Sequence, residues 1–476
     1  MTGSIPPGII QDTANRRFHL IGIGGVGVSA LAQLLLARGA RVSGSDRSLD
    51  RGVILPIFSC LRGLGVELFP QDGSGVSERT DYIVASTAIE SGNPDLEKGA
   101  SLGIPTLSRA QLLADFFHSC RERIAIGGTS GKTTVTAMTA WCLNQSGREF
   151  WSMVGGFLRN VASESCPGNA LFRSGADQIA CIEADESDGS IVLYEPSISL
   201  IHNIGLDHKR IEDLIGLFQE FGDRTRGTVC VNSDCRLATK LSLPVGRTLY
   251  YGTGLEAEIR ASNARLERDW SEFDVNGSRC RIALPGMHNV SNALAALAVC
   301  VSAGMPVVEV IGALGEFKGV KRRAELVGEV DGIRVIDDFA HNPDKLAAAI
   351  TAAKVSCRRL IAVFQPHGFA PTRLMREELI EVFSRTLRPD DILLMPEIYY
   401  AGGSAVKDIS SRDITDAVSA RERRARFVRS RADLAPEIGA LADSGDVVLI
   451  MGARDDTLSD FARDVFETIA RKRQNC

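Results

Sequence analysis

The sequence predicts an α/β protein of several domains with mostly parallel sheets. Apolar runs typical of buried strands alternate along the chain with segments of helical periodicity. The chain has 476 residues, enough for roughly three domains of about 150 residues each. Its composition, 44% hydrophobic and 24% charged, is that of an ordinary globular protein. We place the domains at residues 1–121, 122–320 and 321–476.

The first predicted domain opens with the strand FHLIGI, the turn GIGGVG and the helix SALAQLLLARG. The turn, Gly22 to Gly27, matches G-x-G-x-x-G, where a phosphate approaches the backbone at a helix N-terminus. Asp46 ends the next strand, where a ribose-binding acid is expected. A lone glycine pattern is compatible with any nucleotide diphosphate. A turn with a purely structural role remains an alternative interpretation. The strand DYIVAS and the helix RAQLLADFF follow.

The second domain begins with the strand ERIAIGG and a candidate phosphate loop, GTSGKTT, before the helix TVTAMTAWCLNQ. The standard loop pattern requires a glycine where this chain has Ile126, so the spacing is unusual. Gly128, Gly131, Lys132, Thr133 and Thr134 still form a suitable set. Backbone N–H groups there can cradle phosphates, and we expect Lys132 to reach the β/γ-phosphates and the Thr133 hydroxyl to bind Mg²⁺.

Two further strands of this domain end in polar residues. The strand QIACIEAD leads into four acids, and Glu183 can complete a Mg²⁺ shell because hard cations take oxygen ligands. The strand SISLIHNI precedes His208, which we expect to share the same sheet edge. In the helix PGMHNVSNALAALAVCVSAG, Asn289 can bond a base edge, while Asn292 can equally be a helix residue near the cap.

The third domain begins at RRAELVGEVDGIRVIDDFA and holds the strands RLIAVFQ, DILLMPE and GDVVLIMG. Arg322 and Arg323 suit anionic groups, because guanidinium binds phosphate and carboxylate in fork geometry. Other polar residues follow its strands, namely Asp337, Asp338 and His341 in IDDFAHNP, and His367 and Arg373 in FQPHGFAPTR. The charged stretch 421–426 is interpreted as a solvated helix face.

Composition also excludes several classes of function. The net charge of −5 argues against a nucleic-acid binder, and no apolar run predicts a membrane span or a signal peptide. The eleven scattered cysteines form no zinc pattern, which favours buried thiols in a reducing cytoplasm.

Taken together and in this order, the motifs resemble the Mur ligase family over nearly the whole chain. GIGGVG with SGSD resembles its UDP-sugar domain, and GTSGKTT resembles its phosphate loop, which also lacks the first glycine. EADESDGS, NIGLDH, GMHNVSNALAA, RRAEL, DDFAHNP and FQPH each have a counterpart. The resemblance implies a Rossmann-like UDP-binding domain, a central ATPase domain with a phosphate loop and a Rossmann-like C-terminal domain for the amino acid.

The implied activity is an ATP-dependent, ADP-forming ligase of cytoplasmic peptidoglycan synthesis. It joins L-alanine to the carboxylate of UDP-N-acetylmuramate through an acyl phosphate, which the amine attacks. A carboxylate is a poor electrophile, and phosphorylation supplies its leaving group. The transition states are anionic, so Lys132 and Mg²⁺ would stabilise them. A site shared among three domains would need closure to exclude water. Neither nucleic acid nor membrane is an expected partner, and the oligomeric state stays open.

The resemblance also assigns roles to individual residues. Thr133 and Glu183 would hold one Mg²⁺ and His208 would assist a second. Asn289 and Asn292 would lie near the adenine, and Arg323 and Asp338 would reach the ATP. Catalysis would depend on Lys132, His208, Arg323 and His341. The phosphate loop set comprises Gly128, Thr129, Ser130, Gly131, Lys132, Thr133 and Thr134. The UDP sugar and the amino acid would contact Gly24, Gly25, Val26, Gly27, Ser45, Asp46, Ser86, His341, His367 and Arg373.

The chain departs from the family at the expected amino-acid side. Where QPHRFTRTR is usual it has QPHGFAPTR, so Gly368 and Pro371 replace two arginines, while DDFAHNP replaces DDYGHHP. Each lost charge-assisted pair is worth about 1.5–3 kcal/mol, so carboxylate recognition is expected to weaken. Arg454, in MGARDD, is a hypothetical replacement, and Arg454→Ala would then raise the amino-acid KM more than the ATP KM.

Other functions stay open at this point. A related ligase adds another amino acid or a recycled peptide to the same UDP sugar. A nicotinamide-dependent oxidoreductase would fit GIGGVG but leaves Lys132, Glu183 and His208 without a role. A non-catalytic nucleotide-binding relative would not need the metal ligands.

Overall fold

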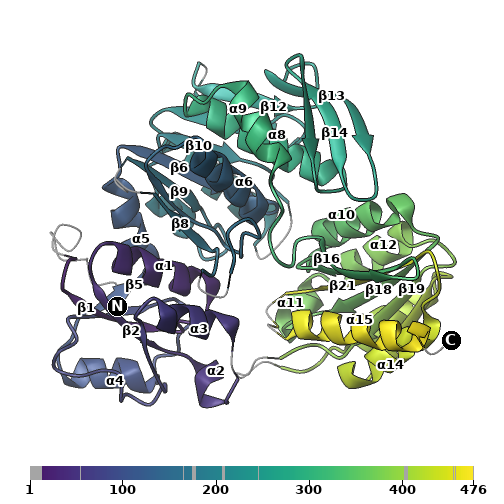
Figure 1. Ribbon diagram of the computed structural model, residues 1–476, viewed down its shortest axis with the longest axis horizontal. Coiled ribbons are helices and arrows are strands. Elements are labelled where there is room, and N and C mark those ends of the chain that lie inside the picture. The colour runs from purple at the N-terminus through teal and green to yellow at the C-terminus, as the bar shows by residue number, and fades with distance from the viewer. Residues whose placement is uncertain are drawn as a thin grey trace. The chain divides into compact units, whose positions relative to one another are not determined.

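The computed structural model describes residues 13–53, 55–163, 166–173, 178–205, 209–244, 246–400, 406–453, 455 and 457–474 (Figure 1). The chain forms two compact units. Unit 1 comprises Met1–Ser262, Val275–Cys280 and Asn292–Lys318, and unit 2 comprises Asn263–Asp274, Arg281–Ser291 and Gly319–Cys476. Three sheets with helices packed on them confirm the predicted α/β class. The first predicted domain and most of the second fall into unit 1, while residues 263–274 and 281–291 of the second belong to unit 2. The boundary near Arg121 therefore stays a prediction.

The N-terminal sheet of unit 1 is parallel, with the strand order β3-β2-β1-β4-β5. The order reverses direction beside β1, so the loops after β1 and β4 face a topological switch point, where α/β proteins bind ligands. The strands are β1 (Arg17–Ile21), β2 (Arg41–Ser45), β3 (Glu67–Phe69), β4 (Tyr82–Ala85) and β5 (Thr106–Ser108). The helices are α1 (Val26–Ala37), α2 (Arg47–Asp50), α3 (Pro56–Gly63), α4 (Pro94–Ser101) and α5 (Arg109–His118).

The second sheet has ten strands in the order β15-β14-β13-β12-β11-β10-β6-β9-β7-β8. β6 lies between β10 and β9 in parallel register, so the phosphate loop that follows it is flanked by the ends of both neighbours. The strands are β6 (Glu122–Gly127), β7 (Phe150–Met153), β8 (Ala170–Phe172), β9 (Ile179–Glu183), β10 (Ile198–Ile201), β11 (Thr228–Asn232), β12 (Thr248–Gly252), β13 (Ile259–Leu266), β14 (Ser271–Val275) and β15 (Ser278–Ile282). Helical elements are α6 (Lys132–Gln145), η1 (Ser190–Leu193), α7 (Ile211–Asp223), η2 (Ala238–Lys240), α8 (Met287–Ser302) and α9 (Val307–Gly315).

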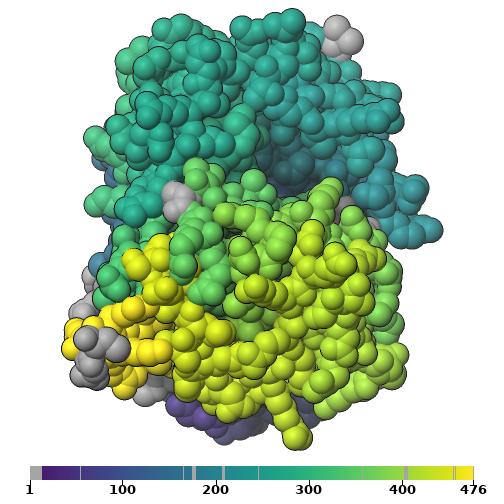
Figure 2. Space-filling model, turned by 90° about the vertical axis from the view of Figure 1, so that its right-hand side faces the viewer, coloured from purple at the N-terminus to yellow at the C-terminus, as the bar shows by residue number. Residues whose placement is uncertain are grey.

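The sheet of unit 2 has the order β16-β17-β21-β18-β19-β20, and only β16 is antiparallel to its neighbour. One apolar core packs α10, α12 and α13 on one face, and a second packs α14 and α15 on the other (Figure 1). The strands are β16 (Glu325–Val330), β17 (Ile333–Asp338), β18 (Arg359–Gln365), β19 (Ile392–Pro396), β20 (Arg424–Val428) and β21 (Asp446–Gly452). Helical elements are α10 (Pro343–Ala353), η3 (Lys354–Ser356), α11 (Phe369–Leu374), α12 (Arg376–Thr386), α13 (Ser411–Ser419), α14 (Arg431–Leu441) and α15 (Leu458–Gln474). The solvent-facing side of α15 is part of the yellow surface in Figure 2.

The sequence had suggested a solvated helix face for the stretch 421–426, but these residues are not helical in the structure. Arg421 and Glu422 form a turn, and Arg424 begins β20 at the edge of the sheet. Alternating exposure along this strand explains the difference, because charged residues on an edge strand also face solvent.

Most described cysteines are buried, as predicted. Eight of the ten are buried free thiols, and only Cys166 and Cys235 are partly exposed. Within the part of the chain that the structure describes, no helix is long and apolar enough to cross a membrane.

Candidate active site

The predicted phosphate loop lies between β6 and α6, and glycine is required at two of its positions. Gly128 has φ +145° and Gly131 has φ +85°, both in the region that favours glycine. A Cβ on Gly131 would lie 2.7 Å from Asn292 Oδ1 and 2.7 Å from His202 Cδ2. The loop therefore keeps a bare backbone at the start of α6, where N–H groups can receive a phosphate.

Asn203, just beyond β10, holds this loop in shape. Its Oδ1 accepts hydrogen bonds from Thr129 Oγ1 at 2.9 Å and from Ser130 N at 2.8 Å. Its Nδ2 donates to Ser130 O at 3.0 Å. Sequence reasoning missed Asn203 because it lies in a different strand's loop, and only the motif NIGLDH pointed to that segment.

Lys132 lies at the first position of α6, with its ammonium group turned back over the loop. Its Nζ donates to Gly128 O at 2.8 Å and to Glu186 Oε2 at 2.6 Å, and Asp185 lies 3.8 Å away. Burial alone would lower the pKa of Lys132, but Glu186 and Asp185 outweigh it and raise the pKa above its ordinary value. The lysine is thus a fixed, permanently charged cation beside the loop.

The two predicted Mg²⁺ ligands that the structure describes lie side by side. Thr133 Oγ1 donates to Glu183 Oε2 at 3.3 Å, and Glu183 Oε1 accepts from Gly155 N at 2.5 Å. Among the described residues no group of three or more His, Cys, Asp or Glu could hold a metal. One hydroxyl and one carboxylate fit Mg²⁺, which binds through few protein oxygens and completes its shell with water and phosphate. His208 lies outside the described residues.

The two asparagines of α8 are both buried, each 4% exposed. Asn292 lies against the Gly131 position of the phosphate loop. Asn289 Nδ2 donates to Pro285 O at 2.8 Å, which fixes this side chain at the start of the helix.

The glycine turn after β1 is held by residues at the end of β2. Asp46 Oδ2 accepts from Gly24 N at 2.9 Å, and its Oδ1 accepts from Ser48 N at 2.8 Å, which caps α2. A Cβ on Gly24 would lie 2.8 Å from Asp46 Oδ2, so glycine is required there for this close approach. The Asp46 carboxylate, which was predicted to bind a ribose, therefore also holds the glycine turn in place.

Ser45 points away from the turn, into the interior. Its Oγ donates to Asp95, which also accepts from Gly73 N at 2.8 Å and faces His19 Nε2 at 3.4 Å. Only the backbone oxygen of Ser45 contacts the turn, accepting from Gly22 N at 2.8 Å. Ser86 is half-buried in the loop after β4.

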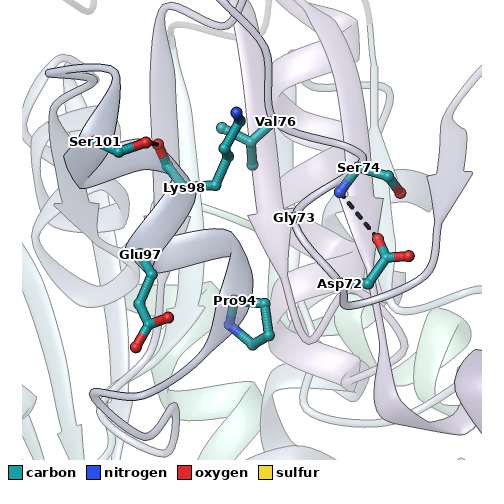
Figure 3. Close-up of a pocket in the computed structure, with 8 residues that line it drawn as sticks. All are labelled: Asp72, Gly73, Ser74, Val76, Pro94, Glu97, Lys98 and Ser101. Atoms are coloured by element: carbon teal, nitrogen blue, oxygen red, sulfur yellow. Dashed lines mark hydrogen bonds between the residues drawn. The ribbon is translucent and has the colours of Figure 1, made fainter.

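A pocket of about 680 Å³ lies beside this buried network, between α4 and residues 72–76 (Figure 3). Asp72 and Ser74 are hydrogen-bonded on one side, with Lys98 and Ser101 on the other. None of its lining residues is a predicted site residue.

Arg109, at the start of α5, is a cation near the glycine turn that sequence reasoning missed. A Cβ on Gly27 would lie 3.4 Å from Arg109 Nη1, and Arg109 Nη2 lies 3.6 Å from Asp188 Oδ2 in the acid loop after β9. The guanidinium therefore contacts both the turn and the EADESDGS segment. A single arginine between motifs gave no signal in the sequence.

In unit 2, Arg323 lies in a turn whose backbone conformation is unusual. Its neighbours Arg322 and Ala324 have φ +59° and +50°, conformations that non-glycine residues rarely adopt. Asp338 accepts from Ala324 N at 2.6 Å and from Ala340 N at 2.7 Å, and so fixes this turn. Desolvation raises the pKa of Asp338, and Arg323 counteracts part of that rise. Arg323 lies over the Phe339 ring, 4.8 Å from its centroid.

His341 and His367 come from the loops after β17 and β18, and their rings meet at 5.5 Å. Burial and Lys345 lower the pKa of His341 well below its ordinary value. Arg373 pairs with Asp408 on an exposed surface. Gly368 has φ +73°, so the glycine that replaces a family arginine also permits a different backbone. Arg454 lies outside the described residues.

Three family models match successive parts of the chain. They are the Mur ligase family, catalytic domain, over residues 17–120, the Mur ligase middle domain over 126–300, and the Mur ligase, glutamate ligase domain over 322–454.

Individual relatives cover nearly the whole chain. The UDP-N-acetylmuramate–L-alanine ligase of Agrobacterium fabrum is 34% identical over 456 residues, covering 91% of this chain and 93% of the relative. The enzyme of that name from Sulfurihydrogenibium sp. is 33% identical, covering 94% and 96%.

Solved structures share the fold. The UDP-N-acetylmuramate–alanine ligase of Thermotoga maritima superposes with a TM-score of 0.77 at 24% identity, covering 97% of this chain and 100% of that one. A murein peptide ligase from Psychrobacter arcticus gives 0.66 at 23% identity, covering 97% and 99%. With matched models along the chain and full-length relatives above 30% identity, this protein belongs to the Mur ligase family.

Proposed function

We propose that this protein is an ATP-dependent, ADP-forming ligase that joins L-alanine to the carboxylate of UDP-N-acetylmuramate in peptidoglycan synthesis. The observation that carries the proposal is the phosphate loop. Asn203 shapes it, and Lys132 is held as a cation beside it by Gly128 O and Glu186. Full-length relatives with this activity in their names support the choice of substrates.

The reaction follows from the chemistry of a carboxylate. The carboxylate oxygen of the sugar attacks the γ-phosphorus of ATP, ADP leaves, and an acyl phosphate forms. The amine of L-alanine then attacks the carbonyl carbon, and the tetrahedral intermediate expels inorganic phosphate and loses a proton. Lys132 would neutralise charge that develops on the transferred phosphoryl group, which is the largest contribution a fixed cation makes to such a step.

We assign the remaining site residues as proposals. Thr133 and Glu183 would hold Mg²⁺, with His208 at a second ion, and a bound Mg²⁺ would neutralise phosphate charge. The phosphate loop, Asn289, Asn292, Arg323 and Asp338 would bind ATP. The glycine turn with Asp46 and Ser86 would bind the UDP moiety, and His341, His367 and Arg373 would serve the amino-acid side. Ser45 would act through its backbone, because its side chain is bonded to Asp95.

Two broader features belong to the same proposal. We place the domains at residues 1–121, 122–320 and 321–476, and the family models match residues 17–120, 126–300 and 322–454. We place the protein in the cytoplasm, because buried free thiols suit a reducing compartment.

The test is phosphate release with Mg-ATP and UDP-N-acetylmuramate across single amino acids and short peptides. We expect release with L-alanine, with one ADP formed per amide. A heavy-oxygen label in the sugar carboxylate should appear in the released phosphate, as an acyl phosphate requires. Release driven by a peptide instead would keep the ligase chemistry and change the acceptor amine. No release with any amine, from a folded protein that binds ATP, would overturn the proposal.

A further inference from the structure

Asn169, just before β8, is a fully buried polar residue outside the proposed site. Its Nδ2 donates to Val26 O at 2.8 Å and to Ser29 Oγ at 2.9 Å, both at the start of α1. Its Oδ1 accepts from Gln33 Nε2 at 2.9 Å, one turn further along that helix. The orientation of the amide is fixed, because the carbonyl of Val26 can only accept and must face Nδ2.

These bonds reach the glycine turn that is proposed to bind the UDP moiety. Val26 belongs to this turn and is also the first residue of α1. The Ser29 hydroxyl, which accepts from Asn169, lies 3.0 Å from both Gly25 O and Val26 O, to which it can donate. The start of α1, where backbone N–H groups can meet a phosphate, is therefore held by Asn169.

The backbone of the same residue is bonded to the segment that holds the proposed magnesium ligand. Asn169 O accepts from Val154 N at 2.8 Å, which extends the antiparallel pairing of β7 and β8. The next residue, Gly155, donates its N–H to Glu183 Oε1 at 2.5 Å. A Cβ on Gly155 would lie 2.6 Å from Glu183 Oε1, so this close approach requires glycine. A shift of the Asn169 backbone therefore moves the hydrogen-bond donor of Glu183.

The contacts form a continuous path from the glycine turn to Glu183, with one covalent step between Val154 and Gly155. All of these residues belong to unit 1. A buried amide that leaves its partners finds no water to replace them, so the Asn169 side chain moves with α1. A ligand that orders one end of such a path restricts the other end, and a second ligand then loses less conformational freedom on binding.

We propose that Asn169 couples the two substrate sites, so that a UDP sugar at the glycine turn and Mg-ATP at the phosphate loop strengthen each other's binding. The inference rests on the proposed function and adds a positioning residue to it. Asn169 acts through Val26 on one side and through Glu183 on the other. Because coupling between binding free energies is reciprocal, each ligand changes the affinity for the other by the same factor.

The test measures the Kd of UDP-N-acetylmuramate by calorimetry, without nucleotide and with a saturating non-hydrolysable ATP analogue and Mg²⁺. The ratio of the two Kd values is the coupling factor, which should be at least about 5 in the wild type and fall to about 1–2 in Asn169→Ala. Because the path ends at a proposed magnesium ligand, the wild-type ratio should be smaller when EDTA replaces Mg²⁺.

Thr225→Ala is the matched control. Thr225 is also buried in unit 1, and its hydroxyl bonds Ser199 Oγ at 2.7 Å and Phe221 O at 3.0 Å. This variant should lower the melting temperature, as Asn169→Ala does, and keep the wild-type ratio. Gln33→Met is a second test, because it retains Asn169 but removes the donor to its Oδ1, and it should give an intermediate ratio. If Asn169→Ala does not fold, Gln33→Met decides the question.

Several results would overturn the inference. A wild-type ratio near or below 1, in a protein that binds both ligands, would refute the coupling and leave the proposed function intact. An unchanged ratio in Asn169→Ala, or in Gln33→Met if the first variant does not fold, would show that Asn169 has only a structural role. An equal fall in Thr225→Ala would show that the ratio follows general stability. The same wild-type ratio with EDTA as with Mg²⁺ would exclude Glu183 as the end of the path. A wild type that binds neither ligand would refute the proposed function together with this inference.

Discussion

Two loops of unit 1 have the same local design, a strand, a glycine-rich turn and a helix, yet differ in charge. The turn after β1 is anchored by the carboxylate of Asp46, which accepts from Gly24 N. The loop after β6 is anchored by the neutral amide of Asn203 and carries Lys132 within it. A carboxylate that takes a backbone donor disfavours an anion at that point, whereas an amide does not. In both loops the glycine pattern therefore specifies the shape of the backbone, while the anchoring residue decides which ligand charge the loop accepts.

The difference assigns separate tasks to the two loops. The first loop has its cation outside the loop, at Arg109, and its anchor suits the hydroxyl donors of a sugar. The second has a cation within the loop, which suits a phosphoryl group whose charge increases during reaction. Substitutions should therefore affect the two substrates differently.

The largest effect is expected from Lys132→Met. Loss of the loop cation should lower kcat by about 10³-fold or more, because the transferred phosphoryl group loses its fixed charge partner. Binding of UDP-N-acetylmuramate, measured by calorimetry, should remain. Since the pKa of Lys132 is raised, the ratio of wild-type to variant kcat should be constant from about pH 7 to 9. A ratio that changes steeply across this range would show that Lys132 titrates there.

Next in size is Asn203→Ala, which removes three hydrogen bonds from the phosphate loop. At about 0.5–1.5 kcal/mol each, their loss should raise the ATP KM about 10- to 100-fold and leave the UDP-sugar KM nearly unchanged. Asn160→Ala is a matched control, because Asn160 also bonds two backbone groups, at Glu316 and Lys318, but lies away from the loop. Equal changes in both KM values would contradict separate roles for the loops.

Arg109→Met should raise the KM for the UDP sugar rather than the KM for ATP. Removal of the guanidinium beside Gly27 should raise the KM for UDP-N-acetylmuramate about tenfold, with the ATP KM within about twofold. Arg62→Met, an exposed arginine on α3, provides the control. A larger effect on ATP would mean that Arg109 acts mainly through Asp188 and the acid loop.

The smallest effect is expected from Asp46→Asn, which keeps an acceptor but removes the charge. The hydrogen bonds to Gly24 N and Ser48 N would weaken by about 1 kcal/mol in total, lowering the melting temperature by about 2–4 °C. Calorimetry would measure the shift. A rise in melting temperature would show that the desolvation penalty of the Asp46 carboxylate exceeds the stabilisation that its hydrogen bonds provide.

Much of the fold followed from the sequence because its strands are long apolar runs bounded by glycine or acid. β1, β6, β9, β18 and β21 all lie where those runs predicted them. The antiparallel pair β7–β8 escaped notice, because β8 has only three residues, Ala170 to Phe172. The edge strand β20 was interpreted as a helix, since charged residues face solvent on either element.

Site residues could be predicted from the sequence only where they belong to a recognisable motif. Lys132, Thr133 and Glu183 lie in motifs, and the structure brings Thr133 and Glu183 together. Asn203 and Glu186 also lie in quoted motifs, but their contacts with the phosphate loop, like the contact of Arg109 with Asp188, emerged only from the tertiary structure, which depends on strand order rather than on local spacing. Ser45 shows the converse, because strand alternation alone does not reveal that a buried aspartate 50 residues away takes its hydroxyl.

The buried thiols can be used to measure the unfolding of the protein, because they become reactive only when they are exposed. Burial raises the pKa of Cys230 and Cys280 to about 12, so hardly any thiolate exists in the folded state. Among the described cysteines, a thiol-reactive dye should therefore label Cys166 and Cys235 at once and the eight buried ones only as the structure opens. Cys357 belongs to unit 2, whereas Cys181 and Cys300 belong to unit 1. Labelling rates read peptide by peptide would then time the unfolding of each unit separately, without an added probe.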